Sequence, residues 1–426
     1  MSLSRYQIII IAVAAILLIV LFLIFTGILP GRKQATDKPP DVSLNIYGFE
    51  SRNAFTDFID NYVKIRSNVR INYYQISPSN YEQGLISAMA SGRAPDIFMF
   101  HSSWLPKHFE KIYPVPQTQL SLIQFRQLFP MVAEQDFTRG ETIFALPLYI
   151  DTPALLYNKD IFDAKKVPIL PSTWTDFQKL VPQIREVNDA NQVTLQAAAI
   201  GGSGRSIDGA TDLLELIMAQ FGNPSVGEDG EIKFNPDAFT AFDFYRQFSN
   251  SLSPYYTWSD DLGNSLDNFS QGKTAAIFNY MSRIPLIKSK NPVLNFGVAP
   301  MPQLGKGRQT VNIADYWGLT VSKASQNPTW AWDFVIQTAT NPDVADAYSK
   351  SVTRPPALRS LISKYINDPQ IGVFASQALT ARSWAKPDSA AVRQIYENMI
   401  ELVLDNRMST KEALVNAREE MNRIMK

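Results

Sequence analysis

The longest apolar stretch of the chain lies near its N-terminus and constrains how the remaining residues are interpreted. Residues 8–25 read IIIIAVAAILLIVLFLIF, without a single charged or polar side chain. A helix needs about 20 apolar residues to cross the hydrocarbon core of a bilayer, whereas a helix on the surface of a globular domain has a polar face. The run therefore predicts a transmembrane helix within residues 1–30, followed by a polar linker over residues 31–41.

The apolar run favours a retained anchor over a cleaved signal. A signal peptide has a shorter apolar core that ends at a small-x-small cleavage site. No such site follows Phe25, where the sequence reads TGILP, and the chain has no cysteine to carry a lipid. We therefore expect one membrane span through residues 8–28, with an atypical signal peptide as the alternative. Arg5, Arg32 and Lys33 leave its orientation open, because long domains cross membranes largely regardless of flanking charge.

Composition excludes several classes of function. Lys and Arg together number 40, as do Asp and Glu, whereas a nucleic-acid-binding protein carries a basic patch or excess. The absence of cysteine excludes disulfides, thiol catalysis and cysteine-based metal sites. A hydrophobic content of 45% favours a globular chain over a disordered one, and a length of 426 residues predicts two domains or two lobes of one. We expect no nucleic-acid partner, no cofactor and no metal.

Strand and helix patterns alternate after the linker. Residues 42–47 and 69–74 alternate apolar and polar side chains, as half-buried strands do, and residues 95–100 form a short apolar strand pattern. Helical patterns lie between them, over residues 55–62 and 81–91. This order predicts an α/β layer with a largely parallel sheet.

A second α/β region begins near residue 144, where helix-capping residues mark the boundaries. Residues 154–157 form a buried strand pattern. Gly92, further back, suits a left-handed C-cap for the preceding helix. A capping box from Ser409 to Glu412 precedes an amphipathic helix over residues 413–425. Other N-caps, each followed by a predicted helix, are Ser172 or Thr173, Asn235, Asn327 and Asn341.

Motifs for covalent chemistry are scarce. His101 and His108 are the only histidines, and their spacing does not match a helical zinc site, so we expect them on the surface or at helix ends. Residues 201–206, GGSGRS, lack the phosphate-loop pattern and predict a loop or a turn into a helix near Asp208. Backbone N–H groups of this segment lining a ligand cleft are the alternative. Spacing singles out no carboxylate pair, which leaves a glycosidase-like pair open.

Aromatic side chains are frequent at positions predicted to lie in loops. Trp and Tyr rings stack on the C–H faces of sugars, while neighbouring polar groups bind hydroxyls. For any single ring, packing in a core or between lobes is the alternative. The aromatic set consists of Trp104, Tyr255, Tyr256, Trp258, Tyr280, Trp317 and Trp384.

Six segments, taken in order, resemble one known family. Residues 91–97 read SGRAPDI, and residues 155–162 read LLYNKDIF shortly after a Leu-Pro pair at 146–147. PSTWTDF at 171–177, FSQGKTAA at 269–276, FGVAPMP at 296–302 and WAWDF at 330–334 follow. In this order and spacing, the chain resembles the extracellular solute-binding proteins of ABC importers, in the sugar-binding group that includes maltose-binding protein.

The resemblance implies a fold and a function. The fold would be α/β, a two-lobed periplasmic-binding-protein-like fold of type II with an N-terminal transmembrane helix. Lobe 1 would hold residues 42–149 and 299–340, and lobe 2 residues 150–298 and 341–426. The chain would be a monomer without enzymatic activity, anchored by a single pass with its bulk outside the cytoplasm. It would capture a carbohydrate between the lobes and deliver it to the permease subunits.

Two alternatives stay open on the sequence. The first keeps the fold but binds a peptide, a polyamine or glycerol phosphate, or serves as a sensory receptor. The second is an anchored carbohydrate-active enzyme.

Ligand-contacting residues are carried over from the family where positions match. Asp151 lies where maltose-binding protein has an acid that binds sugar hydroxyls, and Glu50 follows the first strand. Tyr280, with Arg283 nearby, stands close to where the family often has a Trp, so the resemblance leaves the sugar itself open. The full set expected to contact the ligand is Glu50, Ser102, Ser103, Trp104, Asp151, Trp258, Tyr280, Arg283, Trp317 and Trp384.

Overall fold

The computed structural model describes residues 4–25, 40–189, 192–227, 230–305, 307–386 and 388–425. The chain divides into two units, Met1–Val42 and Ser43–Lys426. In the first unit, α1 (Arg5–Phe25) forms where the apolar run predicts it. Among the described residues it is the one helix long and apolar enough to cross a membrane, a property that anchors and signal sequences share.

The second unit contains a six-stranded sheet built from distant parts of the chain. Its order is β2-β1-β3-β15-β4, and β7 also pairs with β15. β1 and β3 are parallel, whereas β15 runs antiparallel to β3, β4 and β7. The parallel pairing predicted for this region is confirmed for β1 and β3, but the sheet as a whole is mixed rather than largely parallel, because β15, far away in sequence, pairs antiparallel with three strands. The strands are β1 (Val42–Gly48), β2 (Val69–Gln75), β3 (Ile97–His101), β4 (Ile112–Tyr113), β7 (Leu146–Pro147) and β15 (Trp317–Ser322).

Aromatic rings join the helices that cover this sheet. Phe55 of α2 stacks on Tyr73 of β2, with ring centroids 4.5 Å apart. Phe58 of α2 stacks on Tyr348 of α14 at 4.7 Å. This contact places α14 beside the first sheet, although the sequence-based boundary at residue 340 put it in lobe 2; the lobe boundaries otherwise stay a prediction. The helices here are α2 (Arg52–Ile65), α3 (Tyr81–Ala90), α13 (Pro328–Thr340) and α14 (Pro342–Ser351).

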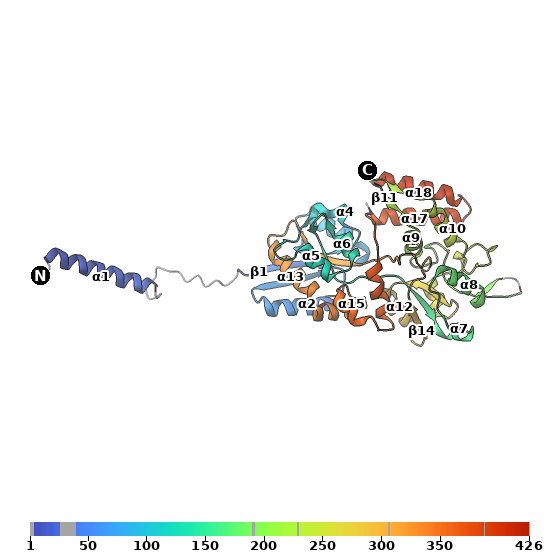
Figure 1. Ribbon diagram of the computed structural model, residues 1–426, viewed down its shortest axis with the longest axis horizontal. Coiled ribbons are helices and arrows are strands. Elements are labelled where there is room, and N and C mark those ends of the chain that lie inside the picture. Colours follow the sequence, from blue (N-terminus) through green and yellow to red (C-terminus); the bar gives the residue numbers. More distant parts are fainter. Residues whose placement is uncertain are drawn as a thin grey trace. The chain divides into compact units, whose positions relative to one another are not determined.

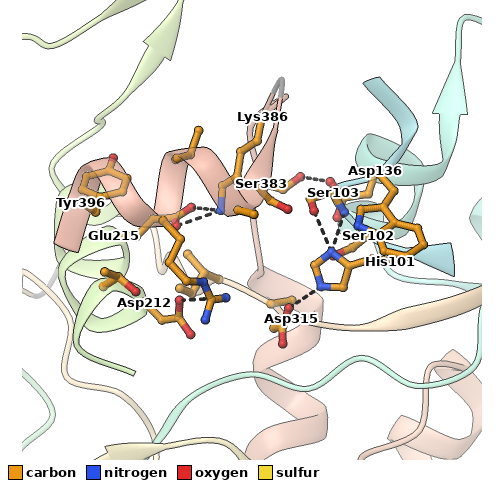
Figure 2. Close-up of a pocket in the computed structure, with 18 of the residues that line it drawn as sticks. His101, Ser102, Ser103, Asp136, Asp212, Glu215, Asp315, Ser383, Lys386 and Tyr396 are labelled. Atoms are coloured by element: carbon orange, nitrogen blue, oxygen red, sulfur yellow. Dashed lines mark hydrogen bonds and ion pairs between the residues drawn. The ribbon is translucent and has the colours of Figure 1, made fainter. Parts of the chain in front are cut away.

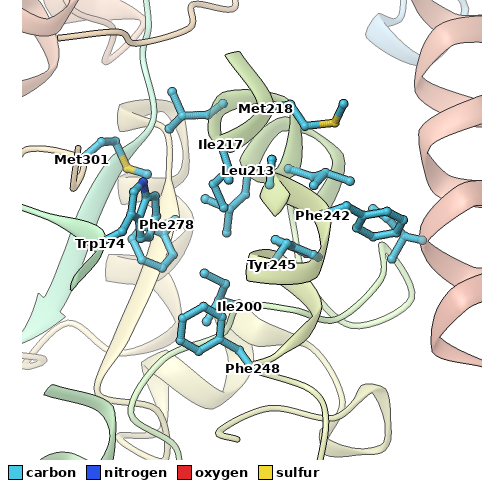
Figure 3. Packing of buried hydrophobic residues seen from close by; sticks show 14 of the residues in the cluster. Trp174, Ile200, Leu213, Ile217, Met218, Phe242, Tyr245, Phe248, Phe278 and Met301 are labelled. Atoms are coloured by element: carbon cyan, nitrogen blue, oxygen red, sulfur yellow. The ribbon is translucent and has the colours of Figure 1, made fainter. Parts of the chain in front are cut away.

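A second sheet has the order β13-β8-β14 and is entirely antiparallel. Leu156 at its centre pairs with Ile277 on one side and Val298 on the other. Aromatic and aliphatic side chains from the sheet and its helices form one core (Figure 3). The strands are β8 (Ala154–Asn158), β13 (Ala276–Asn279) and β14 (Phe296–Ala299); the helices are α8 (Trp174–Ile184), α9 (Ala210–Gln220), α10 (Asp237–Arg246), α17 (Ser389–Leu404) and α18 (Thr410–Met425).

Two segments connect the sheets directly. Residues 148–153 lead from β7 to β8, and residues 300–316 lead from β14 back to β15. The two segments touch through a backbone bridge, in which Asp315 N–H donates to the Asp151 carbonyl at 2.9 Å. A further backbone contact reaches the first of these segments, since Ile150 N–H donates to the Pro355 carbonyl at 3.3 Å. These paired segments therefore form the covalent and hydrogen-bonded connection between the two sheets.

Local capping chemistry sets several helix ends as the sequence predicts. The Thr173 hydroxyl accepts from Asp176 N–H at 3.1 Å at the start of α8. Ser409 and Glu412 form the reciprocal capping box, with Glu412 N–H donating to the Ser409 hydroxyl at 3.3 Å and Ser409 N–H donating to the Glu412 carboxylate at 3.0 Å. Gly92 follows α3 at φ +73°, which L-residues with a side chain rarely adopt.

Short elements complete the architecture, which Figure 1 shows as a ribbon. They are η1 (Pro78–Asn80), α4 (Leu105–His108), η2 (Phe109–Lys111), α5 (Leu122–Leu128), α6 (Met131–Phe137), β5 (Thr138–Arg139), β6 (Thr142–Ile143), α7 (Lys159–Ala164), β9 (Glu186–Val187), β10 (Val193–Leu195), β11 (Ser225–Val226), β12 (Ile232–Lys233), η3 (Asp260–Leu262), α11 (Ser265–Ser270), η4 (Met281–Arg283), α12 (Ile284–Lys290), α15 (Arg359–Tyr365), α16 (Ile371–Gln377) and η5 (Ala378–Thr380).

Candidate binding site

A cavity of about 670 Å³ lies where elements of the two sheets meet. Its volume falls within the range of small-molecule sites, about 300–1,000 Å³. The end of β3 and the residues that follow it form one side, and α9 and α17 form the other. Further lining residues are Pro78, Ser79, Asp136, Tyr280, Ile313, Ala314, Asp315, Trp317, Arg382, Ser383, Trp384 and Lys386. Figure 2 shows Asp212 and Glu215 on one side of this cavity, with His101, Ser102 and Ser103 across from them.

Tryptophan rings line the side next to the first sheet. Trp104 and Trp317 meet edge to face, with centroids 5.0 Å apart. Trp104 also stacks on Tyr81 at 6.0 Å and is only 7% exposed. Trp317 is the first residue of β15 and pairs in register with His101, the last residue of β3. Because strand pairing and ring packing fix these side chains, they present a rigid apolar surface to a ligand.

A histidine–carboxylate pair stands beside the tryptophans. His101 Nε2 lies 2.7 Å from Asp315 Oδ1, and His101 Nδ1 lies 2.7 Å from the Ser103 hydroxyl. Desolvation tends to raise the pKa of Asp315, but the charge and hydrogen bond of His101 outweigh it and hold that pKa below its ordinary range. The expectation that His101 lies on the surface or at a helix end is wrong, because the side chain lines the cavity.

Two carboxylates project from α9 at positions three residues apart, on one face of the helix. The Tyr280 hydroxyl donates to Asp212 at 3.1 Å, and an Arg393 guanidinium nitrogen lies 3.8 Å from the same carboxylate. Lys386 Nζ lies 2.6 Å from Glu215 (Figure 2). Burial raises the pKa of Asp212, while Arg393 acts in the opposite direction. Each carboxylate is therefore held by a cation and keeps a fixed position in the cavity.

A half-buried acid links the two sides. Asp136, at the end of α6, accepts from the Tyr316 hydroxyl at 2.6 Å and from the Ser383 hydroxyl. Burial raises the pKa of Asp136 to about 6, although these two hydrogen bonds lower it in part. The Asp136–Ser383 bond ties the first-sheet side of the cavity to the segment that carries Trp384. Among the described residues, no group of three or more His, Cys, Asp or Glu side chains is arranged to hold a metal ion.

A family model described as bacterial extracellular solute-binding protein matches residues 49–345. The chain belongs to this family. The resemblance stated from sequence motifs is thereby confirmed, and so is the two-lobed α/β fold, since solved structures of this type match almost the whole folded unit.

Relatives of this solute-binding protein are distant. It is 23% identical to a maltotriose-binding protein of Pyrococcus abyssi over 74% of this chain, and 24% identical to a galactooligosaccharide-binding protein of Bacillus subtilis over 66% of this chain. The chain spans 65% of the length of each of these two relatives. Its structure matches that of the sugar-binding protein MalE of Xanthomonas citri with a TM-score of 0.77 at 17% identity, covering 90% of this chain and 97% of that one.

The cavity of the solute-binding protein brings together six of the ten side chains expected to contact ligand. These are Ser102, Ser103, Trp104, Tyr280, Trp317 and Trp384. Trp258 lies outside the lining: it is fully buried in a core cluster, and its indole N–H donates to the Ser206 hydroxyl at 2.9 Å. Arg283 also lies outside, paired with Asp208 at 2.7 Å.

Asp151 and Glu50 are the other two residues outside the lining. The Asp151 carboxylate is buried and accepts from the N–H groups of Thr152, Met281 and Ser282 at 3.0, 3.2 and 3.1 Å. Burial raises the pKa of Asp151 to about 7, against a lowering influence of Arg354. Burial also raises the pKa of Glu50. In this arrangement Asp151 anchors the connecting segment to the start of η4 rather than facing a ligand.

Several lining residues escaped the sequence analysis. His101, Asp136, Asp212, Glu215, Asp315, Lys386 and Arg393 all face the cavity. One signal could have revealed two of them: α9 buries most of its length, yet carries Asp212 and Glu215 three residues apart among apolar neighbours. Charged groups on an otherwise buried helix require partners or a function.

The glycine-rich segment at 201–206 forms turns before α9, as expected, and the helix begins at Ala210. The hydroxyl groups of Ser203 and Ser206 donate to Asp260 at 2.6 Å each. Gly204 N–H donates to Glu397 at 3.1 Å, and Glu397 lines the cavity. The segment therefore contacts the cavity lining through the carboxylate of Glu397 and contributes no lining residue of its own.

Proposed function

We propose that this protein captures a carbohydrate in the cavity and delivers it to the permease of an ABC importer. The observation that carries the proposal is the cavity lining itself, which combines tryptophan faces with carboxylates held by cations. Trp317 offers an apolar ring surface for the C–H face of a sugar ring, and Trp104, which is only 7% exposed, packs against it. Asp212, Glu215 and Asp315 offer acceptors for hydroxyl groups.

Selectivity follows from the cost of unpaired polar groups. A ligand that closes the cavity removes its carboxylates from water, and each buried acceptor left without a donor costs about 1–3 kcal/mol. A sugar with correctly placed hydroxyls satisfies these acceptors, whereas an analogue lacking one hydroxyl is rejected. Arg393 and Lys386 hold the carboxylates of Asp212 and Glu215 in fixed positions. Discrimination therefore depends on where the hydroxyl groups of the ligand lie.

Two relatives are named for oligosaccharides, maltotriose and galactooligosaccharide, which supports a ligand of the same chemical class here. Binding is expected to proceed by turning of the two lobes about segments 148–153 and 300–316, with no covalent step. Non-enzymatic capture agrees with the description of the family as solute-binding.

The same proposal gives α1 the role of a retained anchor, with the folded unit outside the cytoplasm as a monomer. A tether keeps the binding protein at a high effective concentration near its permease. Protease treatment of intact cells tests this arrangement. We expect residues 43–426 to be degraded in intact cells, and their protection would overturn both the topology and the transport function.

Titration calorimetry tests the ligand class. The full-length chain, in a detergent without a sugar headgroup, is titrated with maltotriose, a galactotriose, glycerol phosphate, spermidine and a tripeptide. We expect one of the two saccharides to bind with a Kd of roughly 1 μM or below, about −8 kcal/mol. Binding of only a non-saccharide solute would overturn the carbohydrate assignment, and release of reducing sugar during the titration would overturn the non-enzymatic one.

A further inference from the structure

A second cavity, of about 490 Å³, adjoins the one described above. The two cavities share five lining residues, so they have a common wall rather than lying on separate faces. Three of the five belong to the segment that follows η5. The shared residues are Glu215, Ile313, Arg382, Ser383 and Trp384.

Helix α9 forms a continuous floor under both cavities. Thr211, Asp212 and Glu215 line the first cavity, and Glu215, Ala219 and Gln220 line the second. Positions 211, 215 and 219 are four residues apart, and such positions lie on one face of a helix. From position 211 to position 220 the helix rises about 14 Å, at 1.5 Å per residue. This floor is longer than a single sugar ring.

Trp384 stands at the junction with a fixed orientation. Its indole N–H donates to Glu215 at 3.1 Å. Lys386 Nζ lies 5.6 Å from the centroid of the Trp384 ring and pairs with Glu215. The hydrogen bond and the cation hold the ring, so that Trp384 is an aromatic surface common to both cavities.

The second cavity also has hydrogen-bond donors in its lining. Arg308 and Gln309 line it and are exposed. Asn223 lines it as well, but its side-chain nitrogen already donates to Asn235 at 2.8 Å. The guanidinium of Arg308 and the amide of Gln309 are therefore the groups placed to meet hydroxyl and ring oxygens of a ligand.

We propose that the ligand is an oligosaccharide of at least three rings, which runs from the first cavity past Trp384 into the second cavity. Its distal unit binds to Arg308 and Gln309. This inference rests on the proposed function and adds the length of the ligand and the site that recognises it. A monosaccharide or disaccharide would fill only the first cavity.

Calorimetry with saccharides of increasing length tests this inference on the full-length chain. The series runs from disaccharide to pentasaccharide, in α-1,4-linked glucose and in β-1,4-linked galactose. For the linkage that binds, we expect affinity to rise about tenfold between two and four units, which corresponds to roughly 1.4 kcal/mol. Arg308→Ala/Gln309→Ala is expected to remove most of this gain and to leave the disaccharide Kd unchanged. Arg52→Ala, at an exposed position outside both cavities, is the control.

A second variant fills the cavity instead of removing donors. Ala219→Tyr places a ring on the α9 floor, and Ala164→Tyr, at an exposed position in α7, is its matched control. Loss of the length-dependent gain in Ala219→Tyr alone supports the inference. If saccharides of all lengths bind with equal affinity and neither cavity variant changes that affinity, the inference is overturned while the proposed function stands. Failure of every saccharide to bind overturns both.

Discussion

The imidazole of His101 lies 2.7 Å from the carboxylate of Asp315, although 214 residues separate the two in the chain. β3 ends at His101, and the segment before β15 carries Asp315 to the same edge of the first sheet. His101 contacts one oxygen of this carboxylate, and both residues line the cavity. The pair is therefore the point at which the first sheet presents charge to the cavity.

We predict that Asp315→Asn weakens saccharide binding about tenfold or more, because a charge-assisted acceptor worth roughly 1.5–3 kcal/mol becomes a neutral amide. Titration calorimetry with the tightest-binding saccharide measures this loss. Asp57→Asn, at an exposed position in α2, is the control. An unchanged Kd in Asp315→Asn would show that the ligand does not contact this carboxylate.

Trp317→Ala is expected to lower saccharide affinity by about tenfold, since aromatic contacts contribute roughly 0.5–1.5 kcal/mol beyond the area they bury. Trp317→Phe keeps an aromatic face and should recover part of the loss. Because Trp317 also packs on Trp104, urea unfolding of each variant is measured in parallel. If alanine and phenylalanine bind equally well, ring stacking at this position has no part in recognition.

The substitution Trp258→Phe tests whether Trp258 acts in the core or in ligand binding. Trp258 is fully buried, and its N–H donates to Ser206. We expect the substitution to reduce the free energy of unfolding by about 2 kcal/mol, from lost volume and a lost hydrogen bond. Under conditions in which the variant is fully folded, its affinity for the saccharide should stay unchanged. A selective loss of affinity without loss of stability would instead assign Trp258 to the binding site.

Asp346 provides a prediction that depends on pH. Burial alone would raise the pKa of Asp346, but hydrogen bonds from Lys364, Tyr365 and Lys350 lower it to about 2. Since the folded pKa is below the unfolded one, the ionised carboxylate stabilises the fold above the ordinary Asp pKa, and this contribution is lost as the pH falls toward about 2.

Asp346→Asn should therefore cost roughly 2 kcal/mol of unfolding free energy at pH 7, given that one pKa unit corresponds to about 1.4 kcal/mol. At pH 3 the difference from the unsubstituted chain should be smaller. Urea unfolding at the two pH values, followed by tryptophan fluorescence, measures both. A cost that is equal at pH 7 and pH 3 would contradict an origin in the charge of Asp346.

Local patterns in the sequence predicted the elements whose causes are local. The alternation over 42–47 became β1, and the Ser409–Glu412 capping box starts α18, because these signals act between residues a few positions apart. The position of β15 between β3 and β4 could not be predicted in this way. Pairing between strands so far apart in sequence depends on the whole packed sheet, which no local period encodes.

The residues of the candidate site also fall into those that the sequence could predict and those that it could not. Trp104, Trp317, Trp384 and Tyr280 could be predicted because large aromatic rings in loops are conspicuous in a sequence. Charged lining residues could not be singled out among 40 acidic and 40 basic side chains. Trp258 misled the prediction for a physical reason: a turn can bury a ring as fully as a helix does, and its burial depends on packing partners such as Ser206.

The central place of β15 in the first sheet has a consequence for biosynthesis. β3 leaves the ribosome with no partner on one side, and that partner, Trp317–Ser322, is synthesised only after all three strands of the second sheet. An unpaired strand edge invites association with other chains. The sheet that begins the folded unit is thus completed after the second sheet, and β3 lacks this partner throughout the synthesis of some two hundred residues that separate it from β15.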